Sequence, residues 1–174
     1  MKIRELISEK QIEERISELA NEINKDFDGE EIVIVSILKG SFIFTADLVR
    51  KITVPCTMDF VSLSSYGNSL VSSGVVKILK DLDEEIEGKN VIIVEDIIDT
   101  GRTLSFFVDV LKARNPKSIK ICTILDKPDR RIDEVNVDYI GFKIPDEFVV
   151  GYGLDFEQTH RNLPYIGVVE GKGE

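Results

Sequence analysis

A short stretch of the sequence places three carboxylates beside a glycine, in a pattern that could hold a phosphate next to a metal ion. The stretch is Val91–Leu104, which reads VIIVEDIIDTGRTL. Its apolar start predicts a strand, Glu95 and Asp96 follow, and Asp99 opens a turn that enters a predicted helix. Such a turn aims free backbone N–H groups at one point, where phosphate is the natural guest. Gly101 lets the backbone come close to that guest.

Thr100 and Thr103 would add hydroxyl donors to the same turn. Three carboxylates beside a phosphate need a cation between them, unless one of them acts as a base. Magnesium takes oxygen ligands and bridges one or two carboxylates to substrate phosphates. The residues alone leave a second interpretation open, in which Asp99 only caps the helix and the two preceding acids are solvated.

This motif resembles the binding motif for phosphoribosyl pyrophosphate (PRPP) in type I phosphoribosyltransferases. Its flanks are similar to the hypoxanthine-guanine phosphoribosyltransferase branch, and the resemblance extends from the first predicted helix to RNLPYIG at 161–167. It implies that Glu95 and Asp96 face the ribose hydroxyls and hydrated Mg²⁺, and that Asp99 lies near N7 of a purine as general base or proton relay. It also implies that four consecutive residues surround the 5′-phosphate: Thr100, Gly101, Arg102 and Thr103. Arg102 would contribute mainly its backbone.

Two lysines follow predicted strands elsewhere in the chain. Lys39 and Gly40 could form an ordinary turn with an exposed lysine; by resemblance they form the pyrophosphate loop, and the family often holds the bond before this lysine in the cis form. Lys127 could simply be solvated. By resemblance it donates to O6 of the base, which selects 6-oxopurines because adenine carries an amino group at that position.

The stretch FVVGYGLD at 148–155 resembles the family's base-binding segment. Without the resemblance, Phe148 would be interpreted as a core aromatic residue. The resemblance implies that Phe148 stacks on the purine and that the Val149 backbone reads the base edge. Asp155 would hold a second Mg²⁺ through water or accept a hydrogen bond from the 2-amino group of guanine. Arg161 would approach the pyrophosphate.

Ser65 and Tyr66 begin a stretch rich in glycine, serine and asparagine, which predicts a mobile loop over Tyr66–Gly74. In the family the corresponding loop, here about 65–76, closes over the site as a lid. Loss of pyrophosphate leaves an oxocarbenium-like centre that water would capture, so a lid must exclude water. An ordinary hairpin tip would have the same composition, and the lid assignment therefore rests on the resemblance.

The elements that must position these residues alternate between strands and helices. Apolar residues at helical spacing predict a helix over Ser8–Phe27 with Ser8 as its N-cap, and Ser41 opens a second helix through about Arg50. Further patterns predict a helix at 103–113 and strands at 31–38, 57–65, 75–79, 91–94, 118–125, 139–143 and 148–152. This alternation predicts an α/β fold with a parallel sheet, whose ligands sit outside the carboxyl ends of the strands.

The resemblance implies the type I phosphoribosyltransferase fold: a central mostly parallel sheet flanked by helices, with a small hood and a flexible lid loop. The whole chain, 1–174, is expected to be a single domain, with the hood formed by the N- and C-terminal segments. A length of 174 residues suits one domain with a single core.

The composition limits the possible functions. The net charge of −10 argues against nucleic-acid binding, which needs a basic surface. No apolar run approaches the ~20 residues that span a bilayer, and the N-terminus lacks a signal-peptide pattern. We therefore expect a cytoplasmic protein without membrane attachment. Cys56 and Cys122 are expected to be buried free thiols rather than disulfide or zinc ligands.

The resulting hypothesis is an Mg²⁺-dependent pentosyltransferase of purine salvage. It would transfer phosphoribose from PRPP to hypoxanthine, and also to guanine, giving IMP or GMP and pyrophosphate. The resemblance suggests a homodimer or homotetramer, with basic residues of the second helix region near the interface. One alternative is a regulatory nucleotide- or RNA-binding protein, which the acidic charge opposes. Another is an enzyme for xanthine or a pyrimidine; Lys127 and the FVVGYGLD stretch argue against a pyrimidine.

Overall fold

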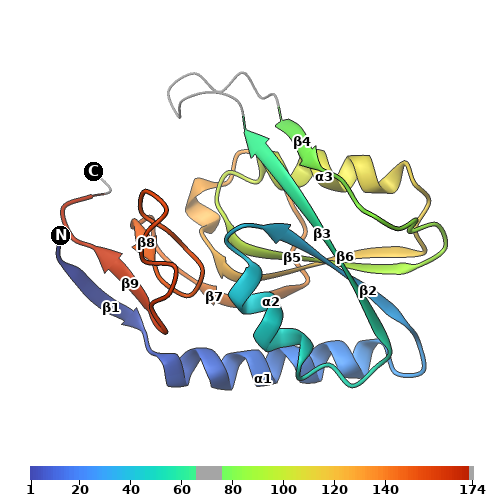
Figure 1. Ribbon diagram of the computed structural model, residues 1–174, viewed down its shortest axis with the longest axis horizontal. Coiled ribbons are helices and arrows are strands. Elements are labelled where there is room, and N and C mark those ends of the chain that lie inside the picture. The colour runs from blue at the N-terminus through green and yellow to red at the C-terminus, as the bar shows by residue number, and fades with distance from the viewer. Residues whose placement is uncertain (66–75, 173–174) are drawn as a thin grey trace.

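The computed structural model of this chain describes residues 1–65 and 76–172. The predicted mobile loop, including Tyr66, lies outside the described residues. In chain order the described elements are β1 (Ile3–Ile7), α1 (Glu9–Asp26), β2 (Ile32–Leu38), α2 (Phe42–Val49), β3 (Cys56–Ser65), β4 (Val76–Lys80), β5 (Asn90–Ile98), α3 (Arg102–Lys112), β6 (Ser118–Asp126), the 3₁₀ turn η1 (Pro128–Arg130), β7 (Tyr139–Lys143), β8 (Val149–Val150) and β9 (Ile166–Val169). Figure 1 shows their arrangement.

The larger sheet has the strand order β4-β3-β2-β5-β6-β7. All neighbouring pairs from β3 to β7 are parallel, and β4 returns antiparallel to β3 at one edge. Strands β2 and β5 lie in the middle, and their apolar runs are buried on both faces, as expected for central parallel strands. The predicted mostly parallel sheet is confirmed.

Helices cover both faces of this sheet. Helices α1 and α2 pack on one face, where Ile34 and Ile92 join their core cluster. Helix α3 packs on the other, with Val35 and Ile93. The two clusters take alternate residues of the same strands, because successive side chains of a strand point to opposite faces. None of the helices in the described ranges has the length and apolar character needed to span a membrane.

Helix α1 begins as its sequence predicts. The Ser8 side chain accepts from the Gln11 backbone N–H, and the Gln11 side chain accepts from the Ser8 backbone N–H, which forms a capping box. Apolar residues at helical spacing face the core: Ile12, Ile16, Leu19, Ala20 and Ile23. The cap fixes where the helix starts, and the apolar stripe fixes which side it turns to the sheet.

A second, three-stranded antiparallel sheet has the order β1-β9-β8. The strand predicted at 148–152 is shorter than expected, since β8 contains only two residues, and it pairs with β9 rather than with the larger sheet. Strands β1 and β9 were not predicted. Figure 1 shows this sheet, with β1 beside β9, at the left of the larger one. The strands are short, and β1 pairs with β9 from the opposite end of the chain, so local patterns carry little signal for them.

Two smaller expectations are also corrected. Strand β5 was expected to end at Val94, but it continues to Ile98 because Ile97 and Ile98 pair with β6. The acidic pair Glu95–Asp96 therefore lies inside a strand rather than after it. Both cysteines are free, as expected, but only Cys122 is buried, whereas Cys56 at the start of β3 is exposed.

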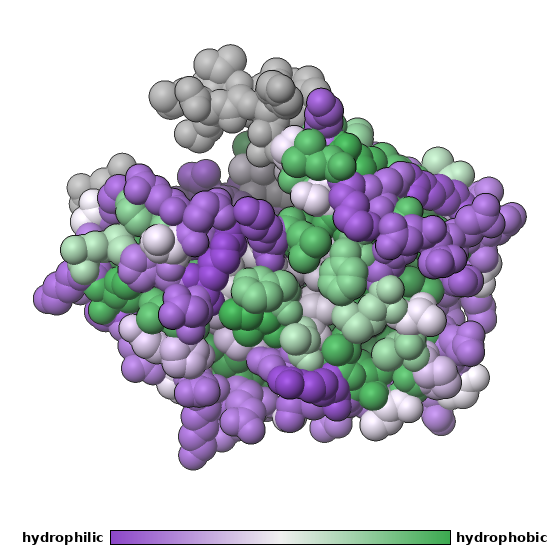
Figure 2. All heavy atoms as spheres, in the orientation of Figure 1, coloured by the Kyte–Doolittle hydropathy of each residue, from purple (hydrophilic) through white to green (hydrophobic). Residues whose placement is uncertain are grey.

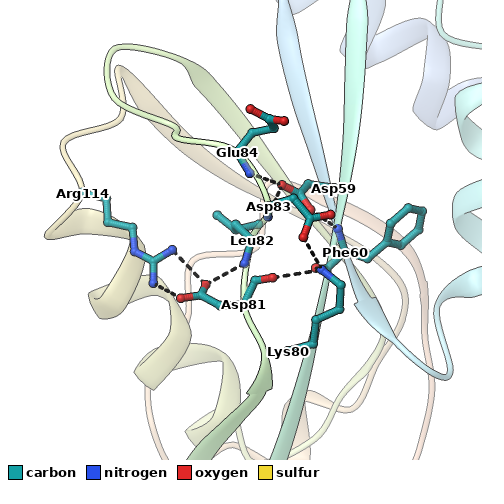
Figure 3. A network of polar contacts seen from close by, with 8 residues as sticks. All are labelled: Asp59, Phe60, Lys80, Asp81, Leu82, Asp83, Glu84 and Arg114. Atoms are coloured by element: carbon teal, nitrogen blue, oxygen red, sulfur yellow. Dashed lines mark hydrogen bonds and ion pairs between the residues drawn. The ribbon is translucent and has the colours of Figure 1, made fainter.

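A polar network holds the segment that follows β4 against β3 and α3 (Figure 3). Asp59 of β3 is only 4% exposed, and its carboxylate accepts from the backbone N–H groups of Phe60, Asp83 and Glu84 at 2.8, 2.9 and 3.1 Å. Asp81 accepts two hydrogen bonds from the Arg114 guanidinium at 2.9 and 2.7 Å. The network therefore fixes the base of the β3–β4 hairpin.

Asp59→Ala should lower the free energy of unfolding by about 2–3 kcal/mol, because three N–H groups lose their charged acceptor in a buried place. Urea denaturation followed by circular dichroism measures this. The matched control is Asp83→Ala, whose exposed carboxylate contacts only Lys80 among the described residues and should cost less than about 0.5 kcal/mol. Equal losses in the two variants would contradict the role given to Asp59.

Candidate active site

The turn between β5 and α3 is held firmly in place. Gly101 is the N-cap of α3 with a φ of 83°, a left-handed conformation that favours glycine. A Cβ there would lie 2.5 Å from the Asp133 carbonyl oxygen. The Thr100 carbonyl accepts from the N–H groups of Ile132 and Asp133 at 2.8 and 3.1 Å. The segment after η1 thus packs directly under the turn, and helix α3 starts at Arg102, one residue earlier than predicted.

This turn borders a cavity of about 270 Å³ at the carboxyl ends of β2, β3 and β5. Ligands of parallel sheets bind at that edge. The cavity brings together most of the predicted phosphate and metal residues of the motif and adds apolar walls. Its lining consists of Ile37, Leu63, Glu95, Ile97, Ile98, Asp99, Thr100, Gly101, Thr103 and Leu104. Ser65, predicted at the start of the lid, is the last residue of β3, two positions beyond Leu63.

Glu95 and Asp96 are half-buried neighbours within β5. Burial raises the pKa of both carboxyl groups, and the Asp96 charge raises the pKa of Glu95 further. Their hydrogen bonds within the described residues come from backbone N–H groups, of Asp96 to Glu95 Oε1 at 3.1 Å and of Ile97 to Asp96 Oδ1 at 2.6 Å. Two adjacent, partly desolvated acids gain stability from a cation placed beside them.

The donor set of this pair suits magnesium, which prefers carboxylate oxygens and keeps several of its waters. Within the described residues, no group of three or more His, Cys, Asp and Glu side chains is placed to hold a metal ion. Asp155, the third predicted metal residue, therefore does not join Glu95 and Asp96 in one cluster. The pair fits an ion that substrate oxygens and water also coordinate.

The loop after β2 packs against this acidic pair. The peptide bond between Leu38 and Lys39 is cis, the form that the resemblance suggested. A Cβ on Gly40 would collide with the Asp96 carboxylate, and one on Gly153 would collide with the Gly40 carbonyl. The loops that carry Lys39 and Gly153 therefore meet at Asp96 of β5, although the three residues are distant in sequence.

Two predicted cation residues share one partner near this meeting point. Arg161 donates to the Gly153 carbonyl at 2.7 Å and to Gln158 Oε1 at 3.0 Å, and it lies 3.5 Å from Asp155. Lys39 Nζ donates to the same Gln158 oxygen at 3.4 Å. Gln158 thus holds the two side chains near each other. Sequence reasoning missed it, because an exposed glutamine far from Lys39 in the chain gives no local signal.

Among the predicted purine residues, Lys127 directly follows β6, Phe148 precedes β8, and Val149 is the first residue of β8. Lys127 is only 8% exposed, so it is not a solvated lysine, and its Nζ lies 3.5 Å from Asp146 Oδ1. Phe148 is 36% exposed and is therefore not a core aromatic; it makes an edge contact with Phe156, with ring centroids 5.8 Å apart. Val149 is buried beside it.

Asp99 has two arginine neighbours that the sequence interpretation did not include. Arg130 Nε donates to Asp99 Oδ1 at 2.9 Å, and Arg131 donates to the Asp99 carbonyl at 3.0 Å. Arg131 also pairs with the buried Asp126 at 2.5 Å. A signal for both existed: they follow β6, and loops after neighbouring parallel strands meet at one edge of the sheet.

Comparisons with known proteins agree with this geometry. The family model described as phosphoribosyl transferase domain matches residues 3–157. The hypoxanthine phosphoribosyltransferase of Buchnera aphidicola subsp. Schizaphis graminum is 53% identical over 169 residues, which cover 96% of each chain. The bifunctional protein TilS/HprT of Listeria monocytogenes is 50% identical over 165 residues, which are 95% of this chain and 26% of that protein. A crystal structure of a hypoxanthine-guanine phosphoribosyltransferase from Bacillus anthracis, 54% identical, has a TM-score of 0.93 and covers 97% of this chain and 99% of its own.

Proposed function

The chain belongs to the phosphoribosyltransferase family, and on that basis we propose that it transfers the 5-phosphoribosyl group of PRPP to hypoxanthine or guanine. The products are IMP or GMP and pyrophosphate, so the enzyme is a pentosyltransferase of purine salvage. The observation that carries this function is the clamped Asp99–Thr103 turn, which lines a cavity together with Glu95. The fold and the enzyme class predicted from the sequence are both confirmed by the relatives.

The turn and two positively charged side chains bind the phosphate groups of the substrate. The 5′-phosphate binds the backbone of Thr100–Thr103 and the two threonine hydroxyls, with Arg102 contributing mainly its backbone. Lys39, Gly40 and Arg161 bind the pyrophosphate. The shared contact of Lys39 and Arg161 with Gln158 supports this pairing. An acidic protein can thus hold anions through local cations and N–H groups.

Glu95 and Asp96 hold Mg²⁺ in this proposal and face the ribose hydroxyls. Their adjacency in β5 and their hard oxygen donors support the assignment. When bound, the ion supplies positive charge that stabilises the departing pyrophosphate. Asp155 would hold a second ion through water, or it accepts a hydrogen bond from the 2-amino group of guanine.

The purine is contacted by Lys127, Phe148 and Asp99. Lys127 donates to O6, Phe148 stacks on the ring, and the Val149 backbone reads the base edge. In the transfer, purine N9 forms a bond to C1′ of the ribose while the bond from C1′ to pyrophosphate oxygen breaks. The proton on N7 passes to Asp99, which acts as the general base. Ser65 and Tyr66 begin the lid that excludes water.

We also propose a cytoplasmic homodimer or homotetramer that folds as one domain. The free thiols fit a reducing compartment. Figure 2 shows apolar side chains gathered in the middle of one face, where α2 lies in Figure 1, and Phe42 at the start of α2 is 43% exposed. Exposed apolar surface of this kind marks an interface between proteins. Light scattering at micromolar concentration checks the assembly, and a monomer would contradict it.

A spectrophotometric assay with PRPP, Mg²⁺ and a panel of bases tests the function. We expect turnover with hypoxanthine and guanine, none with adenine or uracil, and loss of turnover when EDTA removes the magnesium. No product with either 6-oxopurine would contradict the proposal. Turnover confined to xanthine would keep the family chemistry but change the substrate.

A further inference from the structure

Four charged side chains form a line that joins the proposed general base to the proposed O6 donor. Arg130 Nε donates to Asp99 Oδ1 at 2.9 Å, and Arg130 Nη1 lies 3.5 Å from Asp146 Oδ2. The other oxygen of Asp146, Oδ1, lies 3.5 Å from Lys127 Nζ. The signs alternate along the line, so each of its two inner members contacts two opposite charges.

The four residues come from the loops that follow three neighbouring strands. Asp99 follows β5, Lys127 follows β6 and Asp146 follows β7. Arg130 ends the 3₁₀ turn η1, and its backbone N–H donates to the Lys127 carbonyl at 3.1 Å. The turn therefore fixes the distance along the chain between the arginine and the lysine.

The line contributes little to the stability of the fold. The side chains of Arg130, Asp99 and Asp146 are all nearly half exposed, and ion pairs with that exposure have small energies. The arginine instead fixes the orientation of the carboxylates that it contacts, because the N–H donors of its planar guanidinium have a rigid, forked geometry. The hydrogen bond that Arg130 donates to Asp99 is also the chief cause that raises the pKa of Arg130.

The purine explains why the two ends of this line need a fixed spacing. N7 and O6 lie side by side on one edge of a 6-oxopurine. A carboxylate that takes the N7 proton and a lysine that donates to O6 must therefore meet adjacent atoms of one rigid ring. Within the described residues, the side-chain hydrogen bond to Asp99 falls on Oδ1, so Oδ2 is available to take a proton.

We propose that Arg130 is a positioning residue for the purine: it orients Asp99 directly and Lys127 through Asp146, so that both groups meet the same edge of the base. This inference rests on the proposed function. The side-chain contacts of Arg130 go to Asp99 and Asp146, and to neither of the residues assigned to the pyrophosphate, Lys39 and Arg161. Its loss should therefore affect the use of the base and leave the use of PRPP unchanged.

Steady-state kinetics of Arg130→Gln test this, with hypoxanthine varied at saturating PRPP and then the reverse. We expect kcat/KM for hypoxanthine to fall by about 10–100-fold, the scale of a misplaced reacting group. The KM for PRPP and the melting temperature should stay close to wild type. The matched control is Arg114→Gln, an arginine beyond the C-terminal end of α3 that is paired with Asp81, which should change neither constant.

A double-mutant cycle separates a connected line from two independent effects. Asp146→Asn should lower kcat/KM for hypoxanthine as well, and Arg130→Gln combined with Asp146→Asn should lose less than the product of the two single losses. Three results would overturn the inference: a double variant whose loss in kcat/KM equals the product of the two single losses, a wild-type kcat/KM for hypoxanthine in Arg130→Gln, or an equal loss in kcat/KM for PRPP. If the wild-type protein itself transfers to no purine, the proposed function fails first; if only the variants behave like wild type, this inference alone fails.

Discussion

Asp99→Asn should lower kcat for IMP formation by about 10²–10⁴-fold, the usual scale for a positioned base. An amide cannot take the proton from N7, whereas it keeps the shape of the carboxylate. The amide oxygen can still accept from Arg130, which donates to Asp99 Oδ1 at 2.9 Å. The fold and the binding of PRPP should therefore survive, and the loss should appear in kcat from steady-state kinetics.

The matched control for this prediction is Asp129→Asn. Asp129 is an exposed acid on η1, close to the site in sequence but with no ion pair among the described residues. It should keep wild-type turnover, and both variants should keep the wild-type melting temperature. Near-wild-type turnover in Asp99→Asn would remove Asp99 from the role of base.

Lys127→Ala should lose affinity for hypoxanthine by at least about tenfold, because an O6 acceptor left without a donor in a buried place costs about 1–3 kcal/mol. Lys127 is nearly buried, so water cannot easily take its place. Affinity for PRPP should change by less than about twofold, since O6 and the phosphates lie at different ends of the site. Titration calorimetry with each substrate measures both values.

Lys143→Ala is the control for the lysine. Lys143 ends β7 and is exposed, so its removal lowers the net positive charge near the site by the same amount without removing a buried donor. We expect wild-type affinity for both substrates. Unchanged affinity for hypoxanthine in Lys127→Ala would contradict the assignment of O6 to this lysine.

The central part of the fold could be predicted because its signals are local. The apolar runs of β2 and β5 are buried on both faces, and Ser8 caps α1 where the sequence indicates. The second sheet could not be predicted, since β1 pairs with β9 from the other end of the chain. Strand β5 extends through Glu95 and Asp96, where acidic residues replace the apolar residues that normally mark a strand.

The site residues likewise divide into those that a local motif indicates and those that only the three-dimensional structure reveals. The residues from Glu95 to Thr103 are contiguous, so one motif indicates them together, and the structure places most of them around one cavity. Arg130 and Gln158 were missed because their partners are distant in sequence. Arg130 meets Asp99 across 31 positions, and Gln158 meets Lys39 across 119. Such contacts depend on which strands become neighbours, which the motif does not encode.

A crystal structure of the protein with IMP and Mg²⁺ tests the central claim most directly. The claim is that the turn entered at Asp99 binds the 5′-phosphate of a nucleotide. We predict phosphate oxygens within about 3 Å of backbone N–H groups of Thr100–Thr103, with the purine between Lys127 and Phe148. A bound nucleotide whose phosphate lies elsewhere, with that turn making no contact to it, would contradict the account.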